Sequence, residues 1–221
     1  MIKLVIFDLD DTLVPEIEFL KTGYRIVAKR IEEKYGLNAE KSYERLYSLF
    51  LNGEKNNFNM LLNENDIAYS KEEIQELIHL YRTYPRELPL YHDVTAFIHM
   101  LRKNEIAIGI ITDGPVEAQK NKLKCIHAYD VFDYIVLTDE LGIEFRKPNA
   151  KAFEMIIEQA GVKPEETMYI GDNPAKDFYI KKNLKIKTVR ILRENALYAN
   201  QEYLENVKED VTITHLGEVR V

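Results

Sequence analysis

Two patterns of hydrophobic residues divide the chain into an early helical stretch and a longer stretch in which strands alternate with helices. Short, unbroken apolar runs are typical of strands buried on both faces of a parallel sheet. Such runs occur at 4–7, 106–111 and 134–137, and segments of more mixed composition at 167–171, 186–191 and 211–213 are also predicted to be strands. Between them apolar residues recur at helical spacing, as at 94–101 and 152–160. Strands that alternate with helices predict an α/β fold with a doubly wound, Rossmann-like parallel sheet, in which the last two strands lie toward one edge.

Residues 16–84 carry the second pattern, which is helical and nearly free of strand signals. Helical spacing predicts four short helices, near 17–35, 41–51, 56–63 and 71–84. Gly36 is expected to end the first helix, and Ser70 with Glu73 three residues later predicts a capping box at the start of the last. We therefore expect a core domain of residues 1–14 and 88–221 and a small helical-bundle domain of residues 15–87.

Length, charge and cysteine content limit which binding partners and which cellular compartment are expected. A chain of 221 residues with 46% hydrophobic and 30% charged residues is long enough for a core and a modest insert. Its net charge of −7 argues against nucleic acid or an anionic membrane surface as the main partner. The single cysteine, Cys125, excludes an internal disulfide and fits the cytoplasm. No apolar run has the length of a membrane span or the form of a signal peptide.

Three aspartates, Asp8, Asp10 and Asp11, follow the first predicted strand within four residues. Close like charges resist joint ionisation unless a cation holds them, and Mg²⁺ is a hard ion that prefers oxygen ligands. A charged turn leaving the sheet is the ordinary alternative, because aspartates are common in turns. The stretch therefore favours a metal site without proving one.

Polar residues also follow three later strands. Thr112 and Asp113 end the second strand, Lys147 lies in the loop after the third, and Asp172 ends the fourth. Asp177 follows on a helix that Pro174 is expected to open. The carboxyl ends of parallel strands lie along one edge, where open α/β sheets bind ligands. Each residue alone has an ordinary reading, such as a solvated lysine or an aspartate favouring a helix start, but their common placement predicts one site.

In this order the motifs resemble those of the haloacid dehalogenase superfamily. The matching segments are Asp8-Leu-Asp10-Asp11-Thr12, Ile110-Ile-Thr112, Lys147-Pro148, and Tyr169-Ile-Gly171-Asp172 with Asp177. The resemblance covers essentially the whole chain and puts the helical insert where the family's C1-type cap sits. Asp11 departs from the glycine or asparagine that is commoner there, and we expect its side chain to point outward.

The resemblance implies roles for these residues. Asp8 would be the nucleophile that forms an aspartyl-phosphate, and Asp10 would be the general acid and base. Mg²⁺ would be held by Asp8, the Asp10 main-chain carbonyl and Asp172. The phosphate would be bound by Thr112, Asp113, Gly114 and Lys147. Asp177 would orient Lys147, and Thr12 would support the site without contacting the substrate.

The expected function is Mg²⁺-dependent hydrolysis of a small phosphomonoester: a sugar phosphate, an acyl-sugar phosphate or a nucleoside monophosphate. Dehalogenases of the superfamily lack the second aspartate, so Asp10 argues against that chemistry. N-Acylneuraminate-9-phosphatases and nucleotidases are the branches that the motifs most resemble. A sugar-phosphate mutase remains an alternative, although that branch tends to carry a histidine where this chain has Leu20. A non-catalytic binding protein with the same fold is the second alternative.

The expected partner is a small phosphorylated metabolite, with the chain acting as a monomer or homodimer. The helical insert is expected to act as a lid that decides the substrate.

Overall fold

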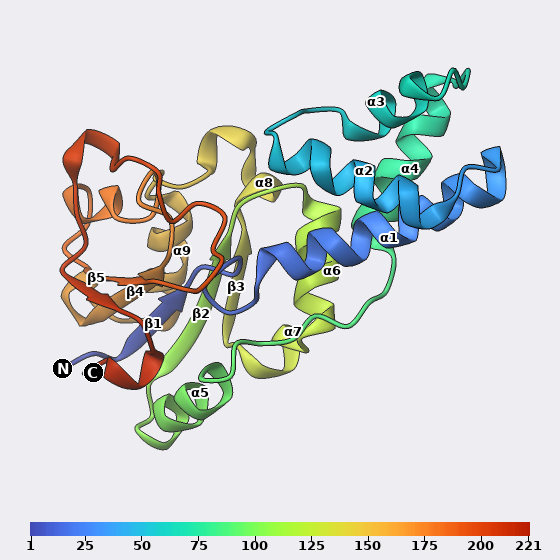
Figure 1. Cartoon of the computed structure of the whole chain (residues 1–221). Helices are drawn as coiled ribbons and strands as arrows, with labels where there is room; N and C mark the ends of the chain where they lie inside the picture. The colour runs from blue at the N-terminus through green and yellow to red at the C-terminus, as the bar shows by residue number, and fades with distance from the viewer. The chain divides into compact units, whose positions relative to one another are not determined.

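Six parallel strands form one sheet in the computed structural model, which describes residues 1–221 (Figure 1). Their order is β3-β2-β1-β4-β5-β6, so the first strand of the chain lies in the interior of the sheet and β6 lies at an edge. The strands are β1 (Leu4–Phe7), β2 (Ala107–Thr112), β3 (Tyr134–Leu137), β4 (Thr167–Gly171), β5 (Lys187–Ile191) and β6 (Val211–Ile213). The predicted fold class is confirmed.

The chain forms two compact units, one of residues 1–17 and 88–221 and the other of residues 18–87. The first unit carries the sheet and the second is helical. The helices of the first unit are α5 (Val94–Lys103), α6 (Val116–Cys125), α7 (Ala128–Val131), α8 (Thr138–Leu141) and α9 (Lys151–Ala160). No helix in the structure combines the length and the apolar composition that crossing a bilayer requires.

The central strand β1 is buried on both faces, as its unbroken apolar sequence predicts. Successive side chains of a strand point to opposite faces. Leu4 and Ile6 belong to the apolar cluster that includes the inner face of α9, whereas Phe7 meets the rings of Phe97 and Phe132 edge-on. Burial of each such side chain contributes roughly 1.5–3 kcal/mol, so the strand that carries the predicted nucleophile is firmly fixed.

The register of the sheet brings the strand ends to one level. Phe7 pairs with Ile110 of β2 and with Ile170 of β4. Asp8, Thr112 and Asp172 follow these paired residues by one or two positions, so the polar residues collect at the carboxyl edge of the sheet.

The second unit contains most of α1 (Glu16–Tyr35) with α2 (Ala39–Leu51), α3 (Asn57–Glu64) and α4 (Lys71–Thr83). The four helices predicted from the sequence are confirmed. Gly36 takes a left-handed φ of 73° after α1, and Ser70 and Glu73 form the predicted capping box. The rings of Tyr24, Phe58 and Tyr81 contact one another in its core.

The helix predicted to carry Asp177 is absent, and this prediction was wrong. Asp177 lies in a turn before a short 3₁₀ helix, Tyr179–Lys182. Asn173 accounts for the turn, because its carbonyl accepts the Asp177 N–H and its own N–H donates to Asp177 Oδ2 at 2.8 Å. Side-chain bonds of this kind compete with helix formation.

Candidate active site

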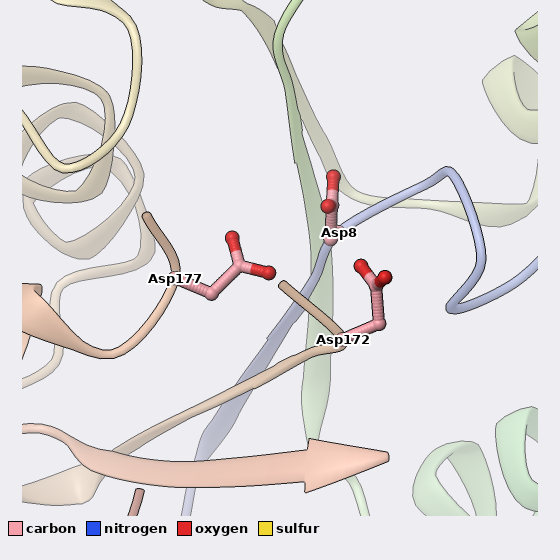
Figure 2. A group of neighbouring side chains, drawn as sticks. All are labelled: Asp8, Asp172 and Asp177. Atoms are coloured by element: carbon pink, nitrogen blue, oxygen red, sulfur yellow. The ribbon is translucent and has the colours of Figure 1, made fainter. Parts of the chain in front are cut away.

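Three buried carboxylates converge at the carboxyl edge of the sheet (Figure 2). Asp8 follows β1, Asp172 follows β4, and Asp177 comes from the turn beyond it, and one oxygen of each lies within 4.8 Å of the others. Asp8 and Asp172 are far apart in the sequence, but they lie close together because β1 and β4 are neighbours in the sheet. The side chain of Asp10 is not in this group, so its expected part in metal binding, through the main-chain carbonyl, stays a prediction.

Lys147 neutralises part of this cluster from within the protein. Its fully buried ammonium lies 2.8 Å from Asp8 Oδ1 and 3.0 Å from Asp177 Oδ1, and it contacts the hydroxyl of Tyr169 at 2.9 Å. Burial alone would lower the pKa of Lys147, but the carboxylates of Asp177 and Asp8 raise it above its ordinary value. The lysine therefore stays charged beside Asp8.

Asp177 has the bonds of a supporting residue. Its Oδ1 accepts the hydroxyl of Tyr169 at 2.9 Å and its Oδ2 accepts the N–H of Asn173. A Cβ at Gly171 would lie 2.5 Å from Asp177 Oδ2, so only glycine allows this carboxylate so close to the end of β4. With its oxygens committed in this way, Asp177 is better placed to hold Lys147 than to bind a cation directly.

The electrostatics of the cluster fit a divalent cation. Burial raises the pKa of Asp8 to about 6, although the ammonium groups of Lys147 and Lys176 oppose this. Burial, with the charges of Asp177 and Asp8, also raises the pKa of Asp172 well above its ordinary value. Asp172 Oδ2 is buried without a hydrogen-bond partner, an expensive state for a carboxylate unless a cation binds it.

Lys176 supplies a second ammonium group near Asp8. Lys176 Nζ lies 3.3 Å from Asp113 Oδ2. The Lys176 side chain is 28% exposed, whereas that of Lys147 is fully buried. Asp113, Asp8, Asp172 and Asp177 supply four carboxylates against the two ammonium groups of Lys147 and Lys176. When all are ionised, a charge of −2 remains, which a divalent cation balances.

The residues expected to bind phosphate lie at the same edge but differ in what they offer. Thr112 Oγ1 is buried without a partner and is free to donate. The carboxylate of Asp113 accepts bonds from Thr138 Oγ1 and the Lys147 N–H, so its side chain braces the site and would repel a phosphate. The Gly114 N–H makes a long bond, 3.3 Å, to Asp139.

Asp10 is held by helix α6, apart from the carboxylate cluster. Lys122 Nζ lies 2.6 Å from Asp10 Oδ1, and Gln119 Nε2 donates to Asp10 Oδ2 at 3.0 Å. The same lysine lies 3.8 Å from Glu16. Burial raises the pKa of Glu16 to about 7, with the charge of Asp10 adding to the effect and Lys122 opposing it.

The expectation that Asp11 points outward was wrong. Asp11 is buried, and its carboxylate accepts the N–H of Glu16 at 2.9 Å and the N–H of Leu197 at 2.7 Å. Its φ of 50° lies in the left-handed region, which explains why glycine or asparagine suits this position. Here the two side-chain bonds offset the backbone strain, and they tie the loop after β1 to the segment after β5.

Arg193 makes a second tie between these segments. Its guanidinium donates to the Thr12 carbonyl at 2.9 and 3.2 Å, and pairs with Asp93 at 2.8 Å. The Asp93 carboxylate also accepts the N–H of Leu216. The buried Thr12 hydroxyl has no partner, so Thr12 supports the loop through its carbonyl.

Sequence reasoning missed Lys122, Gln119, Lys176, Tyr169 and Arg193. For α6 a signal existed: Ala118, Gln119, Lys122 and Leu123 recur at the spacing of one helix face and all are buried. A lysine on an otherwise inward face is costly without a partner, and that could have directed attention to Asp10. For Arg193 no local pattern gave a signal.

The family follows from a comparison with family models. The model described as haloacid dehalogenase-like hydrolase matches residues 2–178, and a second one, described as HAD-hydrolase-like, matches residues 144–219. The chain belongs to the haloacid dehalogenase-like hydrolases, and the prediction that it is an enzyme of this superfamily is confirmed.

Individual relatives are phosphatases by name. The chain is 29% identical to a glyceraldehyde 3-phosphate phosphatase from Pyrococcus furiosus, covering 99% of this chain and 91% of that protein. It is 31% identical to the enzyme of the same name from Methanopyrus kandleri, covering 87% and 85%. A HAD phosphatase structure from Thermococcus onnurineus matches 98% of this chain and 95% of that chain, with 27% identity and a TM-score of 0.62.

Proposed function

We propose that this protein is a Mg²⁺-dependent phosphatase that hydrolyses a small phosphomonoester through an aspartyl-phosphate on Asp8. The observation that carries the proposal is the excess negative charge of the buried cluster, with Asp172 Oδ2 lacking a partner. The relatives reported above are named for glyceraldehyde 3-phosphate, which supports a small phosphorylated metabolite as substrate. They give no support to the acylneuraminate or nucleotide branch.

The cation would be held by Asp8, Asp172 and the main-chain carbonyl of Asp10, and would supply positive charge to the transferring phosphoryl group. Lys147 would supply a second positive charge beside Asp8 while Asp177 and Tyr169 hold its ammonium in place. Thr112 Oγ1 would donate to a phosphate oxygen, which satisfies its otherwise unpartnered hydroxyl.

In the first step, a carboxylate oxygen of Asp8 attacks phosphorus, and the bond from phosphorus to the ester oxygen breaks. Asp10 gives its proton to the departing alkoxide. In the second step Asp10 takes a proton from water, the water oxygen attacks the aspartyl-phosphate, and Asp8 and inorganic phosphate are released. Lys122 and Gln119 aim the carboxyl group of Asp10 in both steps.

The test is Asp8→Asn, because an amide of the same volume cannot attack phosphorus. Turnover of p-nitrophenyl phosphate and of glyceraldehyde 3-phosphate should be lost while the circular dichroism spectrum and melting temperature stay close to those of the wild type. A folded variant that retains a tenth of the activity would show that the covalent step does not occur on Asp8. In the wild type, undiminished hydrolysis in excess chelator would refute the metal assignment.

A further inference from the structure

The residues around Asp10 form a separate polar cluster within the first unit, and its charge is unbalanced. We call Asp10, Asp11, Glu16 and Lys122 the leaving-group cluster. Two of its three carboxyl groups share one ammonium, since Lys122 lies 2.6 Å from Asp10 and 3.8 Å from Glu16. Asp11 accepts the main-chain N–H groups of Glu16 and Leu197.

The position of Glu16 within this cluster is fixed from two sides. Its N–H is held by Asp11 Oδ1 at 2.9 Å, and its carboxyl group faces Lys122. Its side chain is 25% exposed, whereas that of Lys122 is 4% exposed. The lysine is thus buried beside the two carboxyl groups, whereas part of the Glu16 side chain remains accessible.

The bond between Asp11 and Leu197 brings a further polar group to the cluster. Tyr198, the next residue, is 38% exposed. The charge of Glu16 is the largest influence on the Tyr198 hydroxyl and, with burial, raises the pKa of this tyrosine to about 12. A carboxyl group and a neutral phenol hydroxyl therefore lie near Asp10, where hydroxyl groups of a substrate could bond to both.

We propose that the leaving-group cluster selects phosphate esters of neutral, hydroxyl-bearing alcohols and rejects esters whose alcohol carries a carboxylate, with Glu16 as the specificity-determining residue. This inference rests on the proposed function, in which Asp10 protonates the ester oxygen. The atoms bonded to that oxygen must then lie beside the neighbours of Asp10. A hydroxyl group there can donate to Glu16, whereas a carboxylate would meet three carboxyl groups and a lysine already paired.

The test compares two substrates with one skeleton, sn-glycerol 3-phosphate and 3-phosphoglycerate, which differ in a hydroxymethyl against a carboxylate group. The wild type should favour the glycerol ester by about tenfold or more in kcat/KM, the effect of one unfavourable charge contact in a partly buried site. Glu16→Gln should lower this preference by about threefold or more. Glu18→Gln is the matched control, because Glu18 belongs to the other unit and pairs with Lys21, and it should leave the preference unchanged.

Equal use of both substrates by the wild type, or the same preference in Glu16→Gln, would overturn the inference. Binding of the two esters to Asp8→Asn, measured by calorimetry, gives the same comparison without turnover. Loss of all hydrolysis, including that of p-nitrophenyl phosphate, would refute the proposed function, while the binding preference would still decide the role of Glu16. If Glu16→Gln fails to fold, the wild-type comparison in turnover and in binding decides the matter.

Discussion

Lys122 and Asp10 are 112 positions apart in the sequence, and the Lys122 ammonium lies 2.6 Å from Asp10 Oδ1. With Gln119 on the other oxygen, the helix after β2 fixes the direction in which this carboxyl group points. In the proposed reaction Asp10 gives a proton to the departing alcohol, and the orientation of an acid decides how well it transfers a proton. This pair would therefore link α6 to that step.

Lys122→Met should therefore slow the release of poor leaving groups more than that of good ones. We expect a loss of about 10–100-fold with glycerol 3-phosphate and a several-fold smaller loss with p-nitrophenyl phosphate, whose leaving group scarcely needs a proton. Single-turnover measurements of the first step are required, because the hydrolysis of the intermediate should slow for both substrates.

Lys120→Met is the matched control for this prediction. Lys120 lies on the same helix but pairs at the surface with Glu140, and its substitution should change neither rate. Equal losses with both substrates in Lys122→Met would mean that this lysine supports the fold without aiming Asp10.

Metal binding should weaken as the pH falls. Burial raises the pKa of Asp8 to about 6 and raises that of Asp172 well above its ordinary value, so protons compete with the cation. We expect the affinity for Mn²⁺, measured by calorimetry, to fall steadily from pH 7.5 to pH 5, with protons released on binding. An affinity that is constant over this range would contradict the raised pKa values.

The raised pKa values of Asp8 and Asp172 also determine how the stability of the metal-free protein changes with pH. A carboxyl group whose pKa is higher in the folded than in the unfolded state destabilises the fold once it ionises. Metal-free protein should therefore lose stability as the pH rises from about 4, the ordinary pKa of an aspartate, through the Asp8 value of about 6, and saturating metal should remove most of this loss. Urea unfolding at several pH values, with and without metal, measures both.

Asp11→Ala should destabilise the protein by about 2–4 kcal/mol, because it removes the acceptor of two partly buried N–H groups and leaves a non-glycine residue at a left-handed φ. Asp66→Ala is the control. Asp66 has a similar φ of 52° but is exposed, so that variant should cost no more than about 1 kcal/mol. Similar unfolding midpoints for the two variants would show that the bonds of Asp11 contribute little.

The ion pair of Asp93 and Arg193 should contribute stability that is lost at acid pH. Burial alone would raise the pKa of Asp93, but the bonds from Arg193 and Leu216 lower it below its ordinary 3.8. A lowered pKa gives stability that is present above about pH 4 and is lost as the pH falls through the folded-state value. The difference in unfolding free energy between wild type and Asp93→Asn should therefore be larger at pH 7 than at pH 3. A difference that does not change with pH would exclude this contribution.

The sequence-based predictions succeeded where the chemistry lies next to the secondary-structure signal. Asp8, Thr112 and Asp172 each follow an apolar run, so strand prediction alone was enough to bring them to one edge. Asp11 was predicted wrongly because its partner, Leu197, is 186 positions away and gives no local signal. The turn at Asp177 was missed for a related reason, since one side-chain bond to Asn173 outweighed the helix start that Pro174 suggested.

The position of β1 between β2 and β4 also has a consequence for how the enzyme comes into being. During translation β1, which Asp8 follows, leaves the ribosome before the other five strands of the sheet. Its neighbours on the two sides end only at Thr112 and Gly171, and the arginine that holds the Thr12 carbonyl is residue 193. The proposed nucleophile Asp8 is thus made before Lys147, Asp172 and Arg193. The proposed phosphoryl transfer therefore cannot begin until synthesis has passed residue 193.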